Sequence, residues 1–168
     1  MTGPQGAGGA WVRRIPTPIA QRLSGIVTNY RTLQLTLDEV SPDRYREGLR
    51  SRDPRKLKSD VYPLERAFEV AANYVVELVR LGLRELGIAT ADGPTDLHAF
   101  RAAGAISQRL CDQLVQIHRA RNDLAHDYPD LRASAIYEAS ELQIKVIPVF
   151  LREYTRWLRA QRFAAPTT

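Results

Sequence analysis

Apolar residues along most of the chain recur at intervals of three and four positions, which is the spacing of amphipathic helices. We expect a first long helix from Thr17 to about residue 40, with Thr17 as its N-cap and Pro18 at the first helical position. The apolar positions of this helix are Ile19, Leu23, Ile26, Val27, Tyr30, Leu33, Leu37 and Val40. Ser41-Pro42-Asp43 ends it and caps a shorter helix over about 42–51.

A second long helix is expected after Asp53-Pro54, which interrupts the short one. The pattern runs from Leu57 to about Leu86, and Gly87 then has the place of a C′ glycine. Its apolar positions are Leu57, Val61, Leu64, Phe68, Ala71, Ala72, Val75, Leu78 and Val79. A loop over 91–94 follows.

The second half of the chain predicts a short helix and two long ones. Thr95 or Asp96 would cap the short helix, which closes near Gly104. Ser107 would start the next, with Leu110, Leu114 and Ile117 on its inner face. After Pro129 a last helix runs to about residue 162, and Pro148 should kink it.

These elements define the expected domain organisation. No alternating strand pattern and no internal repeat is visible, and four substantial helices with short connections favour an all-α, up-and-down four-helix bundle with short additional helices. We expect one helical domain over 17–163, a flexible glycine-rich tail over 1–16 and a C-terminal tail over 164–168.

Composition narrows the class of protein. The 168 residues are 44% hydrophobic, which is typical of a globular domain. No apolar run is long enough to span a membrane, and the N-terminus lacks the pattern of a secretory signal. The single cysteine, Cys111, suits a reducing compartment, so we expect a cytoplasmic protein. The histidines at 98, 118 and 126 show no zinc-ligand spacing, and we expect neither a metal nor a cofactor.

The net charge is +5, from 24 Lys and Arg against 19 Asp and Glu. A basic balance is compatible with a polyanionic partner such as RNA, and equally with plain solubility. Two basic clusters stand out, one over 44–58 and one formed by Arg152, Arg156 and Arg159. Acidic residues are interleaved in both, so solvated faces are the default interpretation and partner docking is the alternative.

The most specific pattern is the segment over 121–128, Arg-Asn-Asp-Leu-Ala-His-Asp-Tyr. Arg121 is separated from His126 by four residues, Asn122 is a polar residue directly after the arginine, and Tyr128 follows two positions after the histidine. This order resembles the R-x4-H-x-Y motif of the HepT-like branch of the HEPN superfamily.

The surroundings of the motif extend the resemblance over about residues 18–160. Asp60 and the helical segment 64–71 resemble the acidic residue and long helix that precede the motif in that branch. The segment from Gly93 to Ile106 matches its middle part. The resemblance implies a HEPN-like bundle and a metal-independent endoribonuclease. Asp60 and His118, one turn before Asn122, are then candidates to line the cleft.

The residue types suit metal-independent RNA cleavage on chemical grounds as well. Such a reaction needs a group that exchanges protons near neutral pH and a cation that stabilises the phosphorane. Histidine titrates in that range, and arginine offers a fixed fork of donors that keeps its charge. We therefore assign His126 to proton transfer, Arg121 to the phosphorane and Asn122 to orienting them.

Helix geometry limits how one chain could do this alone. On a straight helix Arg121 and His126 would lie about 140° apart, so the helix must end within the motif or the arginine must reach around it. One histidine also cannot easily be both base and acid in one step. HEPN proteins typically form dimers with two motifs facing one cleft, which implies a homodimer here.

The resemblance also implies a partner and a regulatory site. HepT toxins are encoded beside MntA-type nucleotidyltransferase antitoxins, which transfer AMP to the motif tyrosine. Tyr128 is then the acceptor, and the chain is the toxin of a type VII-like toxin–antitoxin pair. The alternatives are a non-catalytic HEPN module that partners a nucleotidyltransferase and, further away, a helical DNA-binding regulator, for which no helix-turn-helix is visible.

Overall fold

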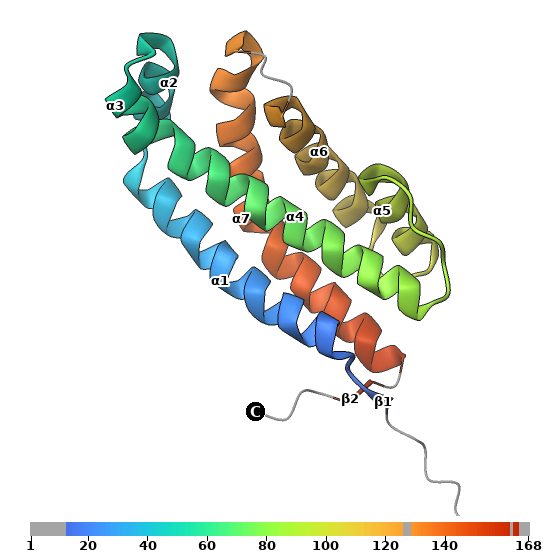
Figure 1. Ribbon diagram of the computed structural model, residues 1–168. Helices are drawn as coiled ribbons and strands as arrows, with labels where there is room; N and C mark the ends of the chain where they lie inside the picture. The colour runs from blue at the N-terminus through green and yellow to red at the C-terminus, as the bar shows by residue number, and fades with distance from the viewer. Residues whose placement is uncertain (1–12, 126–128, 162, 165–168) are drawn as a thin grey trace, which may run out of the picture.

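The computed structural model describes residues 13–125, 129–161 and 163–164, and the side chains of 14–124 and 135–161. This part of the chain is all-helical apart from two short strands, and its long helices pack into a bundle (Figure 1). In chain order the elements are β1 (Arg13–Arg14), α1 (Thr17–Glu39), α2 (Pro42–Ser51), α3 (Pro54–Lys56), the π-helical turn η1 (Leu57–Val61), α4 (Tyr62–Glu85), α5 (Gly93–Ala102), α6 (Gln108–Ala125), α7 (Pro129–Ala160) and β2 (Phe163–Ala164). The expected helical bundle is confirmed.

Several helix boundaries lie where the sequence placed them. The Ser41 hydroxyl accepts a hydrogen bond from the Arg44 amide at the start of α2, as an N-cap does. At the end of α4, Gly87 has a φ of 69°, and the amide of Ile88 bonds back to the carbonyl of Leu83. This left-handed turn after the helix is what glycine permits at little steric cost.

Other boundaries differ from the prediction. The N-cap of α5 is Asp92, whose carboxylate accepts from the Thr95 amide, so the helix starts earlier than a cap at Thr95 or Asp96 would allow. Asp96 is buried instead and bonds to Arg80 of α4. At α1 the N-cap position is Pro16, without a side-chain cap, and Thr17 already lies in the helix.

Two features of the backbone were not anticipated at all. The segment before α4 is a π-helical turn, in which the Tyr62 amide bonds to the carbonyl of Leu57. Near the chain ends, β1 pairs in parallel with β2, with Arg13 opposite Phe163 and Arg14 opposite Ala164. Two residues per strand are too few to produce an alternating pattern that sequence analysis could detect.

Helix α4 is the centre of the bundle. It packs most extensively against α1 and also contacts α5, α6 and α7, while α6 packs along α7. Tyr154 of α7 is fully buried, and its hydroxyl donates to the carbonyl of Leu78 on α4 over 2.9 Å. The ring of Phe100 from α5 lies edge-on to Trp157, with centroids 5.0 Å apart. These contacts fix α5 and α7 relative to α4, and α6, which carries Arg121, packs against α7, α5 and α4.

Candidate functional site

Helix α6 carries the first two residues of the motif. Its inner face is buried through Leu110, Leu114 and Ile117, as the sequence predicted. Arg121 and Asn122 follow in its last turn and a half and are half-buried. Nη1 of Arg121 donates to Oδ1 of Asn122 over 3.2 Å, so the amide holds one side of the guanidinium. The two residues therefore interact directly.

A carboxylate from α4 lies on the other side of this guanidinium. Nη2 of Arg121 is 3.8 Å from Oε1 of Glu69, and Nη1 of Arg66 donates to Oε2 of Glu69 over 3.1 Å. The side chains of Arg121 and Glu69 are 30% and 34% exposed, so the ion pair is open to water on one side. The distance of 3.8 Å makes it a weak restraint, which another anion can replace.

The guanidinium of Arg121 keeps unused donors. Its Nε is buried and has no hydrogen-bond partner among the residues that the structure describes. An arginine has five N–H donors in a planar fork, and the contacts to Asn122 and Glu69 use only part of them. The N–H groups on the partly exposed side of Arg121 can therefore donate to an additional anionic oxygen.

Sequence analysis missed Glu69 and Arg66 as parts of this site. Glu69 belongs to the helical segment that carried the resemblance, but its pairing with Arg121 spans more than fifty positions. The only local signal was the spacing of three between Arg66 and Glu69, which is common on solvated helix faces. Nothing in a single sequence identifies a long-range pair of this kind.

His118 lies one turn before Asn122 and is packed inward. A Cβ atom at position 93 would overlap its ring, so Gly93 at the start of α5 is required for this close approach. With Gln143 and apolar residues of α4, α5 and α6, His118 lines a cavity of only about 10 Å³. His118 thus lies in the wall between helices rather than along an open cleft.

The electrostatic environment of His118 disfavours its charged form. Burial lowers the pKa of His118 most, and the positive charges of Arg121 and Arg80 lower the pKa further, against weaker opposite effects of Asp92 and Asp96. The imidazole is therefore neutral around pH 7 and can accept a proton or a hydrogen bond.

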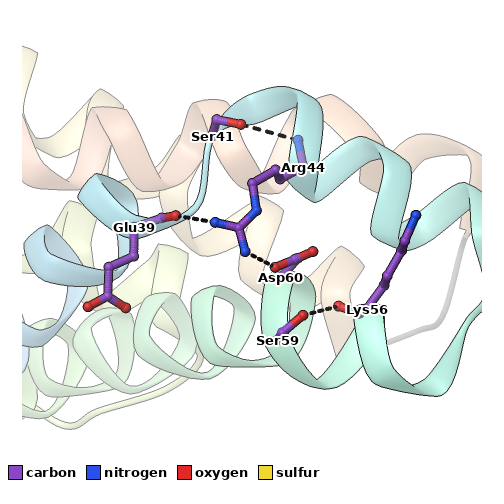
Figure 2. Close-up of polar contacts among 6 residues, drawn as sticks. All are labelled: Glu39, Ser41, Arg44, Lys56, Ser59 and Asp60. Carbon is purple, nitrogen blue, oxygen red and sulfur yellow. Dashed lines mark hydrogen bonds and ion pairs between the residues drawn. The ribbon is translucent and has the colours of Figure 1, made fainter.

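Asp60, the other candidate to line the cleft, has a structural partner. Figure 2 shows Arg44 reaching from α2 to the carboxylate of Asp60 on η1 and to the backbone carbonyl of Glu39. Asp60 is 8% exposed, and this ion pair connects the end of α1, α2 and η1. Among the described residues no contact joins Asp60 to Arg121, so the structure does not bring these two candidates together.

His126 and Tyr128 lie outside the described residues. Their predicted roles in proton transfer and as AMP acceptor stay predictions. Helix α6 is described as far as Ala125 and α7 from Pro129, and the two helices pack along each other.

The two basic clusters differ in how their charge is used. In the cluster over 44–58, Arg44 pairs with Asp60, Arg46 with Asp43 and Lys56 with Glu47. Arg152, Arg156 and Arg159 on α7 are exposed, and none of them forms an ion pair within the described part of the chain. Three of the seven cations in the first cluster thus have a carboxylate partner at short range, which fits the interpretation as a solvated, structural face.

Further searches of the described residues concern metals and membranes. No group of three or more His, Cys, Asp or Glu side chains in residues 13–125, 129–161 and 163–164 is arranged to hold a metal ion. Nor does any helix in that part of the chain combine the length and apolar character of a membrane span.

A comparison of the sequence with protein-family models and with curated proteins finds no match. The resemblance to HepT-like proteins, which was based on the motif and its surroundings in the sequence, therefore stays an expectation. In chemical terms, the end of α6 presents a partly exposed guanidinium and an amide that holds it. A guanidinium of this kind is chemically suited to phosphate-like anions.

Proposed function

We propose that this protein is a metal-independent endoribonuclease whose reaction centre is formed by Arg121, Asn122 and His126. The observation that carries the proposal is the arrangement of Arg121 at the end of α6. Its guanidinium is held by Asn122, is 30% exposed, and has an Nε without a hydrogen-bond partner among the described residues. An arginine fixed in this way suits a phosphorane with two negatively charged oxygens.

In the proposed reaction a 2′-hydroxyl of the substrate attacks the adjacent phosphorus. His126 takes the proton of that hydroxyl, the P–O5′ bond breaks, and the leaving oxygen receives a proton. The products are a 2′,3′-cyclic phosphate and a free 5′-hydroxyl. Arg121 stabilises the charge of the phosphorane, and Asn122 keeps the guanidinium oriented. A homodimer would supply a second His126 as the acid.

We further propose that the chain is the toxin of a type VII-like toxin–antitoxin pair and acts in the cytoplasm. An MntA-like nucleotidyltransferase would neutralise it by transferring AMP to Tyr128. The phosphate of that group would lie two residues from His126 and compete with RNA for the guanidinium of Arg121. The support for this part is the motif and its resemblance to HepT-like sequences.

The direct test is cleavage of RNA by the purified protein in excess EDTA. Wild type should cut RNA and leave cyclic phosphate and 5′-hydroxyl ends, whereas Arg121→Ala and His126→Ala should not. Arg119, exposed on the same helix and without an ion pair among the described residues, provides a matched control, and Arg119→Ala should cleave as wild type does. Loss of cleavage upon chelation would contradict the metal-independent mechanism.

One observation favours a second candidate, a non-catalytic HEPN module that binds a nucleotidyltransferase. Arg121 already has a carboxylate neighbour, Glu69, and could serve only to connect α6 to α4. Under this alternative Arg121→Ala would lower the thermal stability without any activity to lose. Copurification with a nucleotidyltransferase, with RNA left intact by wild type, would favour the module.

A further inference from the structure

The outward face of α4 carries arginines near both of its ends, Arg66 at one and Arg80 and Arg84 at the other. At 100° per residue, positions 66, 73, 77, 80 and 84 lie within about 60° of one another around the helix axis. Arg66 and Arg84 on this face are exposed, and Arg80 is half-buried. In Figure 1 α4 runs across the front of the bundle between α1 and α6. The exposure of Arg66 and Arg84 shows that the face of α4 that carries them is open to solvent.

Both neighbouring helices add an arginine to the same face. Arg22 of α1 lies 2.7 Å from Glu77 and over the ring of Tyr74, and Arg121 of α6 approaches Glu69. We call Arg22, Arg66, Arg80, Arg84 and Arg121 the basic track. In the described structure Glu69 pairs with Arg66 and Arg121, Glu77 with Arg22, and buried Asp96 with Arg80. The two glutamates are partly exposed, so phosphates can compete with them for the guanidinium groups.

The end of the track remote from Arg121 is hollowed. A groove of about 300 Å³ between α1 and α4 is lined by Pro18, Arg22, Glu77, Arg80, Leu81 and Arg84. Arg80 is fixed in it, because Nε donates to buried Asp96 and Nη2 to the carbonyl of Ala91. Arg84 has no ion pair or side-chain hydrogen bond among the described residues, so its donors are free for a ligand.

We propose that the basic track binds the phosphate backbone of the RNA strand and leads it from the groove at Arg84 to Arg121. From Arg66 to Arg84 the track is eighteen positions, or about 27 Å, long, so it spans several nucleotides. Its arginines neutralise phosphates and contribute binding that is independent of sequence. The identity of the polyanion as RNA rests on the proposed function, whereas the location of the track rests on the arginines themselves.

Binding can be measured without cleavage. The probe is a fluorescent 2′-O-methyl oligoribonucleotide, which lacks the attacking hydroxyl, and its anisotropy is followed with the full chain at several salt concentrations. Arg84→Gln removes one phosphate contact and should weaken binding about 5-fold at 0.1 M salt, with a shallower salt dependence. Glu77→Gln removes a carboxylate and frees Arg22, so it should tighten binding several-fold.

Two controls make the outcome decisive. Arg109→Gln makes the same change of charge at an exposed position of α6 outside the track and should leave binding within two-fold of wild type. Equal effects of Arg84→Gln and Arg109→Gln, or weaker binding by Glu77→Gln, would overturn the track. Vesicles of phosphatidylserine that bound through Arg84, with no binding of the oligonucleotide, would overturn it in favour of a membrane surface.

This experiment separates the two proposals. An oligonucleotide that binds through Arg84, together with RNA that the protein never cleaves, would leave the track in place and refute the endoribonuclease. Cleavage of RNA that is unaffected by Arg84→Gln, at substrate concentrations below saturation, would refute the track and leave the endoribonuclease in place.

Discussion

Replacing Asp96 by alanine should destabilise the protein, because this carboxylate connects three parts of the fold. Asp96 is 1% exposed and accepts hydrogen bonds from Nε of Arg80 over 2.7 Å and from the amide of Ala91 over 2.6 Å. It thereby fixes α5 and the loop before it to α4. Removing it would leave both donors without their acceptor.

The magnitude follows from the burial of the two partners. Breaking a fully buried ion pair costs about 3–5 kcal/mol, since the remaining charge is left without water. The side chain of Arg80 is 38% exposed, however, so its guanidinium can regain water. Charge-assisted hydrogen bonds contribute about 1.5–3 kcal/mol, and we therefore expect a loss of about 2–3 kcal/mol. In a chain of this size that lowers the Tm by about 4–12 °C.

The assay is urea denaturation followed by circular dichroism, with the slope of the free energy against urea compared between variants. Asp112→Ala is the control, because Asp112 is an exposed aspartate on α6 that bonds only to Gln108 in the described structure, and it should change stability by less than about 0.5 kcal/mol. A loss below about 0.5 kcal/mol for Asp96→Ala, with an unchanged slope, would refute the structural role assigned to the pair with Arg80.

Three further predictions follow from buried groups. Burial and the charges of Arg121 and Arg80 lower the pKa of His118 below its usual 6.5, so the unfolded chain binds more protons than the folded chain at acid pH. The contribution of neutral His118 to the free energy of unfolding should therefore be present above pH 6.5 and decline below it. In urea titrations at pH 7 and pH 5, His118→Gln should reduce that decline. Burial, aided by the charge of Asp112, raises the pKa of the Cys111 thiol, so Ellman's reagent should react with this thiol only upon unfolding. Rapid reaction of the native protein would contradict the burial of Cys111 in the core. Tyr154→Phe removes a buried hydrogen bond to Leu78 and should cost about 1–2 kcal/mol in the same urea assay, whereas an unchanged midpoint would show that the bond contributes nothing.

The sequence predicted the features that local chemistry determines. Ser41 before Pro42, Gly87 after a run of apolar positions, and Ser107 at the start of α6 are signals that act within three or four residues, and the structure confirms them as boundaries. The cap of α5 was misplaced because Asp92 and Asp96 are both suitable capping residues by type. The choice between them depends on Arg80 of α4. Asp96 is buried at the interface of α4 and α5, where it accepts a hydrogen bond from Arg80, so Asp92 is left to cap the helix.

The candidate site was predicted only in part for a related reason. Arg121 and Asn122 could be found because their spacing to His126 is a local pattern, and the hydrogen bond between them agrees with the role of Asn122. Glu69, the groove at Arg84 and the inward packing of His118 against Gly93 depend on how α4, α5 and α6 meet. Those contacts are tertiary, and the periodicity of one sequence carries no information about which helix faces which.

The most direct test of the central claim is growth after induced expression, with cellular RNA analysed on a gel beside it. The account predicts that wild type and Arg119→Ala arrest growth and fragment RNA, while Arg121→Ala, Arg121→Lys and His126→Ala do neither, because a lysine lacks the fork of donors that Arg121 provides. Intact RNA and equal growth for wild type and all variants would contradict the endoribonuclease and leave the motif with a structural or binding role.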